Sequence, residues 1–325
     1  MKHIFLHACI AALLGSVVCA EKLAKPASLK VLVWNVWHGT NDVDQGPEKA
    51  LALIRKSGAD VCLLQESYDI KGNRPNYGPW AAKQLGWHHY QGKSPHLCVL
   101  SRFPIKKTFF FKGWHAIGAE LDTGAHGALH VFSIWLDYRS GVGGYLKKHP
   151  KATNAELLAC ETKHSGRLNK CRDMLAYLKK NQLLDLKTPL LVGGDWNCPS
   201  HLDWTSATAK LTGKPHLYRR ALPLPVSLAM HESGFRDSFR VIHPDPVKYP
   251  GNTWSPLFKT SGDGVPQPMN RIDRLYLKEN GKKPRLTPVR ATVYPETHEA
   301  ENIPTKQREF PSDHAALLIE YHWGK

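Results

Sequence analysis

The chain has 325 residues, of which 44 are Lys or Arg and 28 are Asp or Glu, so its formal net charge at pH 7 is +16. This length suits one large domain with a substantial core, and the absence of internal repeats, low-complexity linkers and long apolar runs after residue 20 excludes a repeat array and later transmembrane helices. The basic excess favours an anionic partner such as nucleic acid, a phospholipid headgroup or an acidic cell surface, and solubility is the alternative explanation for it.

Residues 1–20 have the pattern of a secretory signal peptide. A basic start precedes an apolar run over 8–18, and a small residue, Ala20, ends a cleavage-site pattern. The run is too short to cross a bilayer as a helix. Because Cys19 lacks a small residue before it, simple export is favoured over a lipid-anchored start. We therefore expect a secreted or periplasmic protein in which residues 21–325 form a single domain.

Hydrophobic patterning along the rest of the chain predicts many strands and few helices. Strands are predicted, in chain order, at residues 29–35, 61–65, 97–100, 109–121, 128–136, 190–192, 271–277 and 315–321. Helices are predicted at 47–56, at 154–180 with a possible break at Gly166, and at 227–232. A succession of strands with few interspersed helices indicates a layered α/β fold rather than a helical bundle.

Five cysteines follow residue 20, and their odd number and spacing lack the Cys-x-x-Cys pairs of a zinc site. Cys62 and Cys98 lie in apolar strand patterns and are interpreted as core residues. Cys160 and Cys171 bracket a polar stretch. They either form a disulfide in an oxidising compartment or are held apart by a continuous helix.

The stretch LVGGDWN at 191–197 ends an apolar strand in two glycines. Gly193 and Gly194 have no Cβ, so they allow either a sharp turn or the close approach of a ligand. Asp195 and Asn197 are two residues apart and would project to the same side of an extended chain. The pair either binds a hydrated cation and a phosphate or caps a turn.

Polar side chains stand at other strand ends as well. Asn35 ends the first predicted strand, Glu66 follows the second, and Asp313 and His314 precede the last. Such junctions are where a rigid sheet presents a site. Glu66 and Asp313 are hard oxygen ligands suited to Mg²⁺ or Ca²⁺, and His314 is suited to act as a general base or to stabilise a phosphate.

Six short blocks that include these residues follow one another along the chain: VWN at 33–35, LLQE at 63–66, LSRFPI at 100–105, GDWN at 194–197, RID at 271–273 and SDH at 312–314. In this order they resemble the endonuclease/exonuclease/phosphatase superfamily, here as a secreted, bacterial-type member. The resemblance spans nearly all of the chain after residue 20. It implies a DNase I-like α/β fold, a four-layer α/β/β/α sandwich of two packed, mostly antiparallel sheets flanked by helices.

The resemblance also implies roles for individual residues. Glu66 resembles the metal-binding glutamate, assisted by Asn35, and Asp313 resembles a second carboxylate of the metal shell. The implied cation is Mg²⁺, with Mn²⁺ or Ca²⁺ as alternatives. Such a cation would neutralise phosphate oxygens and stabilise the leaving group of a phosphodiester.

A catalytic group is implied in the same way. Asp195 resembles the aspartate that positions or activates the attacking water, and Asn197 the asparagine that holds the scissile phosphate. His314 resembles the histidine that contacts the phosphate, and Asp273 the carboxylate that orients it.

One block departs from the family pattern. Many members carry Asn-x-His-Leu at the end of a middle strand, whereas this chain reads SIWLDYR at 133–139, with Trp135 at the histidine position. Strand alternation puts Asp137 and Arg139 on the same side as Trp135. Either Asp137 supplies the missing function or another group does, and His38 is a candidate. Trp135 itself is either a core residue or a residue that stacks on substrate.

A second unusual segment, HLDW at 201–204, follows the GDWN block. With Asp137, Tyr138 and Arg139, its Trp204 is expected either to complete a substrate pocket by stacking on a base or a sugar, or to pack in the core.

We therefore expect a secreted, divalent-metal-dependent phosphoesterase, a phosphodiesterase or nuclease that hydrolyses P–O bonds by metal-assisted in-line attack of water. The basic balance and ten tryptophans favour nucleic acid as the substrate. The alternatives are a phospholipase C-like activity of the sphingomyelinase or phosphoinositide type, a phosphomonoesterase, and a non-catalytic binding module on the same scaffold. We expect a monomer.

Overall fold

The computed structural model describes residues 28–72, 74–211, 220–260, 264–281 and 285–324. The predicted signal peptide lies outside these ranges. None of the described helices is long and apolar enough to cross a membrane.

The first of two six-stranded sheets contains the strands that begin and end the described chain. Its strand order is β11 (Leu286–Tyr294), β12 (Ala316–Trp323), β1 (Ser28–Asn35), β2 (Val61–Gln65), β4 (Cys98–Ser101) and β3 (His88–Tyr90). β1 and β2 are parallel, and the other neighbours are antiparallel. The carboxyl ends of β1 and β2 therefore lie side by side.

The second sheet is built on the same plan. Its strand order is β5 (Ile105–Lys112), β6 (Ala116–Asp122), β7 (Ala128–Trp135), β8 (Leu190–Asp195), β10 (Asp273–Lys278) and β9 (Arg236–Asp237). β7 and β8 are parallel, and the other neighbours are antiparallel. Both sheets are thus mostly antiparallel, which confirms the prediction.

The two sheets pack face to face around one buried apolar cluster that draws side chains from both of them. Gly193 of β8 lies at this contact, because a Cβ there would come within 2.7 Å of the side chains of Val33 and Leu275. A Cβ on Gly194 would lie 1.9 Å from the carbonyl oxygen of Ile134 on the neighbouring strand. The two glycines therefore permit close packing within the protein, and neither of the two predicted uses, a sharp turn or ligand approach, explains them.

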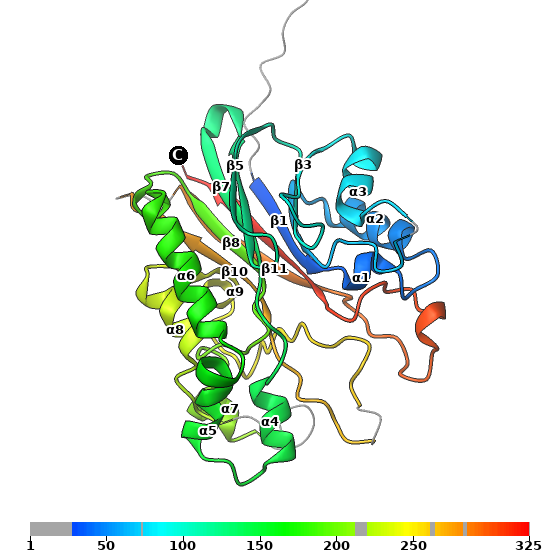
Figure 1. The fold of residues 1–325 in the computed structure, drawn as a ribbon, viewed down its shortest axis with the longest axis vertical. Helices are drawn as coiled ribbons and strands as arrows, with labels where there is room; N and C mark the ends of the chain where they lie inside the picture. Colours follow the sequence, from blue (N-terminus) through cyan, green and yellow to red (C-terminus); the bar gives the residue numbers. More distant parts are fainter. Residues whose placement is uncertain (1–27, 73, 212–219, 261–263, 282–284, 325) are drawn as a thin grey trace, which may run out of the picture.

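Helices cover the outer face of each sheet (Figure 1). The α-helices are α1 (Trp37–Thr40), α2 (Gly46–Ser57), α3 (Tyr77–Leu85), α4 (Val142–Lys148), α5 (Asn154–Ala159), α6 (Arg167–Lys180), α7 (Ser206–Ala209), α8 (Pro225–Glu232) and α9 (Ser238–Ile242). α2 and α3 pack on the first sheet, and α6 and α8 on the second, each pair through its own buried cluster. The result is the predicted four-layer α/β/β/α sandwich.

Two predicted elements are divided in the structure. The single strand predicted over 109–121 is wrong, because the chain turns between β5 and β6, at residues 113–115. The helix predicted over 154–180 is broken at Gly166, as its possible break anticipated. Gly166 has φ +65°, a left-handed conformation that favours glycine, and a π-helical turn at 160–164 precedes it.

The five cysteines of the described chain are all free and buried. Cys160 and Cys171 lie on opposite sides of the break at Gly166. The Sγ of Cys171 contacts the carbonyl oxygen of Val226 at 3.9 Å, and the Sγ of Cys160 contacts that of Glu156 at 3.6 Å. Of the two alternatives for this pair, the structure has the one without a disulfide, although the helix between them is not continuous.

Candidate active site

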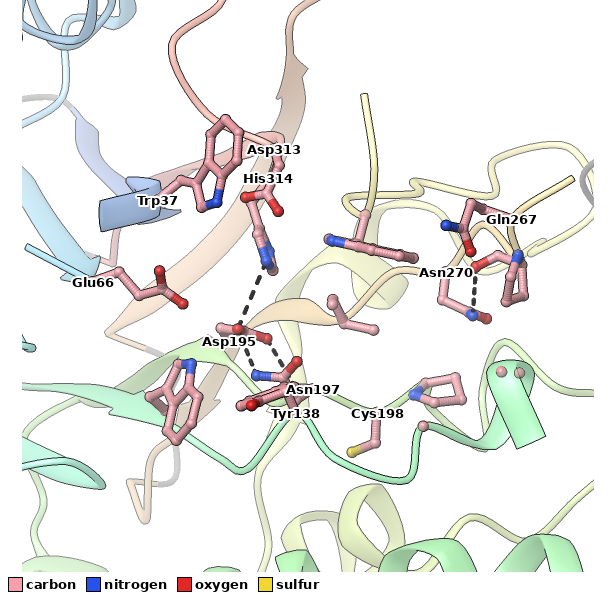
Figure 2. A pocket seen from close by; sticks show the side chains of 18 of the residues that line it. Trp37, Glu66, Tyr138, Asp195, Asn197, Cys198, Gln267, Asn270, Asp313 and His314 are labelled. Atoms are coloured by element: carbon pink, nitrogen blue, oxygen red, sulfur yellow. Dashed lines mark hydrogen bonds and ion pairs between the residues drawn. The ribbon is translucent and has the colours of Figure 1, made fainter. Parts of the chain in front are cut away.

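The parallel pairs of the two sheets end at one cavity. In the first sheet Asn35 is the register partner of Gln65, and in the second Trp135 is the partner of Asp195. The cavity has a volume of about 630 Å³, and Glu66, Asp195 and His314 are among the residues that line it (Figure 2). The sandwich therefore brings together polar residues that are far apart in the sequence.

Asn35 connects the two sheets. Its Nδ2 donates a hydrogen bond to Oε1 of Glu66 at 3.1 Å and to Oδ2 of Asp195 at 3.2 Å. The side chain is buried, and its Oδ1 accepts from the backbone N–H of Trp37 at 3.0 Å. With its donors and acceptor engaged, Asn35 fixes the carboxylates of Glu66 and Asp195 relative to each other.

Asn197 orients Asp195. Its backbone N–H donates to Oδ1 of Asp195 at 2.9 Å, and its Nδ2 donates to Oδ2 of the same carboxylate at 2.7 Å and to the carbonyl oxygen of Leu136 at 2.8 Å. The two side chains meet because Asn197 has a left-handed backbone, with φ 49°, rather than because the strand continues. Both Nδ2 hydrogens are used within the protein, so Asn197 acts here through Asp195.

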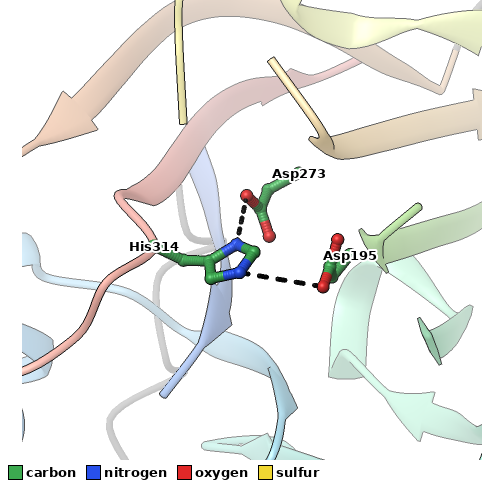
Figure 3. A group of neighbouring side chains, drawn as sticks. All are labelled: Asp195, Asp273 and His314. Atoms are coloured by element: carbon green, nitrogen blue, oxygen red, sulfur yellow. Dashed lines mark hydrogen bonds and ion pairs between the residues drawn. The ribbon is translucent and has the colours of Figure 1, made fainter. Parts of the chain in front are cut away.

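His314 lies between two carboxylates (Figure 3). Its Nδ1 is 3.0 Å from Oδ2 of Asp273, and its Nε2 is 3.9 Å from Oδ2 of Asp195. Burial alone would lower the pKa of His314, but the neighbouring carboxylates, led by Asp273 and Asp195, outweigh burial and hold the pKa well above its usual value. These carboxylates therefore favour the charged form of His314, whose Nε2 is directed toward Asp195.

Burial raises the pKa of Asp195. The positive charge of His314 opposes this effect, while the carboxylates of Asp273 and Glu66 add to it. A group of this kind holds its proton more readily than a surface aspartate does, so it is suited to accept one from water.

Glu66 and Asp313, the predicted metal ligands, both line the cavity. Burial raises the pKa of Asp313 to about 6, and the nearby carboxylate of Glu66 contributes to the rise. Oδ1 of Asp313 is buried without a hydrogen-bond partner. Figure 2 shows both carboxylates directed into the cavity. Two carboxylates that line one cavity, one of them with an unpartnered buried oxygen, have the chemistry that a hard divalent cation requires.

A second set of potential ligands lies deeper. Asp195, Asp273 and His314 each offer an atom, and these atoms lie within 4.8 Å of one another. A cation bound through His314 Nδ1 would have to displace the hydrogen bond between His314 and Asp273. We therefore interpret this set as an ion-paired triad.

The remaining predicted site residues are of two kinds, those that line the cavity and those that do not. His38, Trp135, Tyr138 and Trp254 line the cavity, as do three aromatic residues that the sequence did not single out, Trp37, Tyr68 and Trp114. Nδ1 of His38 is 2.8 Å from Asp42, and its Nε2 is 3.8 Å from Oε2 of Glu66.

Trp204 does not reach the cavity. It is 1% exposed, donates from Nε1 to Oδ1 of Asn270 at 3.0 Å, and packs with Val142 and Leu146 of α4. Of the two roles considered for Trp204, the structure supports packing, because no ring face is free to stack on a substrate.

Asp137 and Arg139 form a pair outside the cavity lining. Nε of Arg139 donates to Oδ1 of Asp137 at 3.0 Å, and Nζ of Lys170 is 3.4 Å from Oδ2. The hydrogen bonds from Arg139 hold the pKa of Asp137 well below its usual range. The alternation argument fails because β7 ends at Trp135. Asp137 is therefore a poor proton donor and a structural partner, which corrects its predicted catalytic role and the predicted substrate contact of Arg139.

Comparison with known proteins identifies the family of the chain. Residues 32–314 match the model of the Endonuclease/Exonuclease/phosphatase family. The chain belongs to this family. An uncharacterized protein of Caenorhabditis elegans is 28% identical to it over 303 residues, which are 90% of this chain and 91% of that protein.

Solved structures share the fold of this family member at low sequence identity. An AP endonuclease from Archaeoglobus fulgidus has a TM-score of 0.55 and 15% identity, covering 90% of this chain and 98% of its own. TDP2 of D. rerio, complexed with single strand DNA product, has a TM-score of 0.55 and 14% identity, covering 91% and 100%. An endonuclease/exonuclease/phosphatase from Beutenbergia cavernae has 0.52 and 16%, covering 92% and 72%.

Proposed function

We propose that the protein is a divalent-metal-dependent phosphodiesterase that acts on nucleotide phosphodiesters. One observation carries the proposal. Asp273 holds Nδ1 of His314 at 3.0 Å, so that Nε2 points toward the Asp195 carboxylate at 3.9 Å, in a cavity that also contains Glu66 and Asp313. This combination of a proton acceptor, a cationic donor and oxygen ligands is what attack of water on a phosphoester requires.

Each residue of the site has a separate task in this mechanism. Asp195 orients a water molecule and accepts its proton, while Asn35 and Asn197 hold the carboxylate in place. His314 donates from Nε2 to a phosphate oxygen, where negative charge grows in the transition state. Asp273 keeps the ring oriented and charged. A cation held by Glu66 and Asp313 would neutralise phosphate oxygens and stabilise the leaving group.

The charge of the cavity supports a diester in preference to a monoester. None of the described residues that line it is a lysine or an arginine. A phosphodiester carries one negative charge, whereas a monoester carries close to two at neutral pH. The positive groups of the proposed site are His314 and one cation. They neutralise the single negative charge of a diester more completely than the nearly double charge of a monoester.

Hydrolysis of methyl p-nitrophenyl phosphate after removal of metal tests the proposal. We expect turnover with Mg²⁺ or Mn²⁺, no turnover after dialysis against a chelator, and recovery when the cation is restored. Asp195→Asn should lower kcat by on the order of 10² to 10⁴ at unchanged melting temperature. Full activity in the chelated protein, or in Asp195→Asn, would contradict the mechanism.

We also propose that the protein is exported and works as a monomer. The support for export is the signal-peptide pattern of residues 1–20. Amino-terminal sequencing of the protein recovered outside the cytoplasm should begin near Glu21, and the unprocessed chain in the cytoplasm would refute export. Sedimentation at micromolar concentration should give the mass of one chain.

A further inference from the structure

An aromatic cluster forms one side of the cavity. We call it the aromatic wall, and it consists of Tyr68, His96, Trp114, Trp135 and Tyr138. The rings of His96 and Trp114 are stacked with centroids 4.2 Å apart, and Tyr68 is stacked on His96 at 5.7 Å. Trp135 meets the edge of His96 at 4.9 Å.

The members of the wall come from separate parts of the chain. Tyr68 follows β2, His96 precedes β4, Trp114 lies in the turn between β5 and β6, and Trp135 ends β7. Core packing does not explain the positions of Trp114 and Tyr138, because they are 50% and 68% exposed. Large aromatic side chains at the mouth of a cavity are typical of ligand contact.

The wall carries no charge. His96 is 1% exposed, and neither of its ring nitrogens has a hydrogen-bond partner. Burial lowers the pKa of His96 to about 3, and the neighbouring His115 acts in the same direction. A neutral His96 stacks on Trp114 as a flat ring, so the exposed part of Trp114 extends an existing stack.

The wall is adjacent to the reacting centre. Trp135 is the register partner of Asp195 on the neighbouring strand, and its ring centroid is 6.2 Å from that of Trp114. Tyr68 stands two residues after Glu66. A substrate with its phosphate beside Asp195 and Glu66 therefore has its next chemical group against the wall.

We propose that the aromatic wall binds the single nucleobase next to the scissile phosphate, so that the preferred substrate is a small nucleotidyl diester or a free strand end. The proposal rests on the phosphodiesterase function above. Stacking accepts any base because every base has a π-face. The described lining offers no lysine or arginine for the phosphates of a longer duplex.

A quaternary ammonium group fits the wall less well. Such a cation is recognised when several ring faces surround it. His96 already lies among Tyr68, Trp114 and Trp135, at centroid distances of 5.7, 4.2 and 4.9 Å, so the space that these rings enclose is filled. A planar base needs only one exposed face, and Trp114 provides it.

Competitive inhibition of methyl p-nitrophenyl phosphate hydrolysis tests the wall. The three probes are thymidine 5′-monophosphate, 2-deoxyribose 5-phosphate and phosphocholine. The first two share phosphate and sugar and differ only in the base. We expect thymidine 5′-monophosphate to inhibit at least about tenfold more strongly than the sugar phosphate, since stacking of one base contributes on the order of 1–3 kcal/mol.

Variants assign that difference to the wall. Trp114→Ala should raise the inhibition constant of thymidine 5′-monophosphate about tenfold, toward that of the sugar phosphate, and Trp114→Phe should restore most of the loss. Trp323→Ala is the matched control, because Trp323 is also stacked on a histidine, His126, at 4.4 Å but does not line the cavity. It should keep the wild-type ratio.

The outcomes separate the two proposals. If the diester is not hydrolysed with any divalent cation, the phosphodiesterase function fails. If it is hydrolysed but both thymidine 5′-monophosphate and the sugar phosphate inhibit alike, the base subsite fails while the function stands. Stronger inhibition by phosphocholine than by thymidine 5′-monophosphate would overturn the base subsite in favour of a cationic headgroup.

Discussion

Asp273 favours the charged form of His314 and orients its ring, although Asp273 itself does not line the cavity. It is fully buried, its backbone N–H donates to Oγ1 of Thr253 at 3.0 Å, and its Oδ2 holds Nδ1 of His314 at 3.0 Å. A carboxylate in this position fixes the tautomer and orientation of the imidazole and favours its charged form. In the proposed mechanism Asp273 therefore acts through His314 rather than on the substrate.

Asp273→Asn should lower kcat on a small diester by on the order of 10²-fold, because the amide keeps the shape but loses the charge that supports His314. KM should change little, since Asp273 does not contact substrate. Asp122→Asn is the control, because Asp122 is an exposed carboxylate paired with Lys106 at 3.2 Å away from the site. Equal kcat for both variants would show that His314 needs no carboxylate partner.

Asp137 should behave as a structural residue. Its pKa is held low by Arg139, so its carboxylate stabilises the fold above the usual aspartate pKa of about 4, and this contribution is lost as pH falls further. Asp137→Asn should therefore lower the free energy of unfolding by about 1–3 kcal/mol at pH 7, with a smaller difference below pH 4. Denaturant unfolding at both pH values measures this.

The turnover of Asp137→Asn tests whether Asp137 also has a catalytic role. We expect Asp137→Asn to keep kcat within about threefold of wild type, because the residue does not line the cavity. A loss of a hundredfold or more at unchanged stability would restore the catalytic role that the sequence first suggested. His38, which does line the cavity, would otherwise be the histidine to examine by His38→Gln.

At the scale of elements, β10 is anchored by a buried ion cluster. Arg271 is 1% exposed, and its Nη2 lies 2.9 Å from Asp203 and 2.8 Å from Asp237. Nε of Arg240 is 2.6 Å from Asp203. Because Arg271 stands two residues before Asp273, this cluster fixes the start of the strand that carries the partner of His314.

Arg271→Met should lower the free energy of unfolding by about 3–5 kcal/mol, because it leaves two buried carboxylates without their common partner. Chemical denaturation measures the change. Arg290→Met, at an exposed position of β11, should change stability by less than about 0.5 kcal/mol. Similar values for the two variants would mean that the buried cluster does not stabilise the fold.

Whether a strand can be predicted depends on how clearly its hydrophobic pattern is bounded in the sequence. Strand β2 is buried throughout and was predicted at 61–65 with correct bounds, because a short apolar run between Asp60 and Glu66 leaves little choice. β11 was not predicted, since it is an edge strand in which Pro288 lies beside a register shift. β5 and β6 merged in the prediction because the turn between them carries apolar Trp114 rather than a typical turn sequence.

The same distinction holds for the site. Asn35, Glu66, Asp195 and His314 could be predicted because each lies in a short block next to a strand end. The aromatic wall could not, because it exists only when loops from both sheets come together. The sequence offered a hint in the unusual SIWLDYR segment at 133–139, but the fold selects Trp135 and Tyr138 for the cavity and turns Asp137 away from it.

At the scale of the whole molecule, the lysine and arginine side chains of the described residues lie apart from the lining of the candidate active site. The chain has a net charge of +16, yet none of the described residues that line the cavity is a lysine or an arginine. Long-range attraction of an anionic substrate and its neutralisation at the reacting phosphate are therefore supplied by different parts of the protein. Only the former involves exposed charges, which salt screens within about 10 Å at 0.1 M.

Salt should consequently act on long substrates and spare small ones. For a short single-stranded oligonucleotide, kcat/KM should fall about tenfold between about 50 and 200 mM salt, because each phosphate that a surface cation contacts adds to the dependence. For methyl p-nitrophenyl phosphate the change should stay below about twofold, since its one phosphate is handled inside the cavity. Steady-state kinetics at constant free Mg²⁺ compares the two. If kcat/KM for the small diester fell as steeply with salt, exposed surface charges would have to act at the reacting phosphate. If kcat/KM for neither substrate changed with salt, the basic excess would serve solubility rather than capture of the substrate.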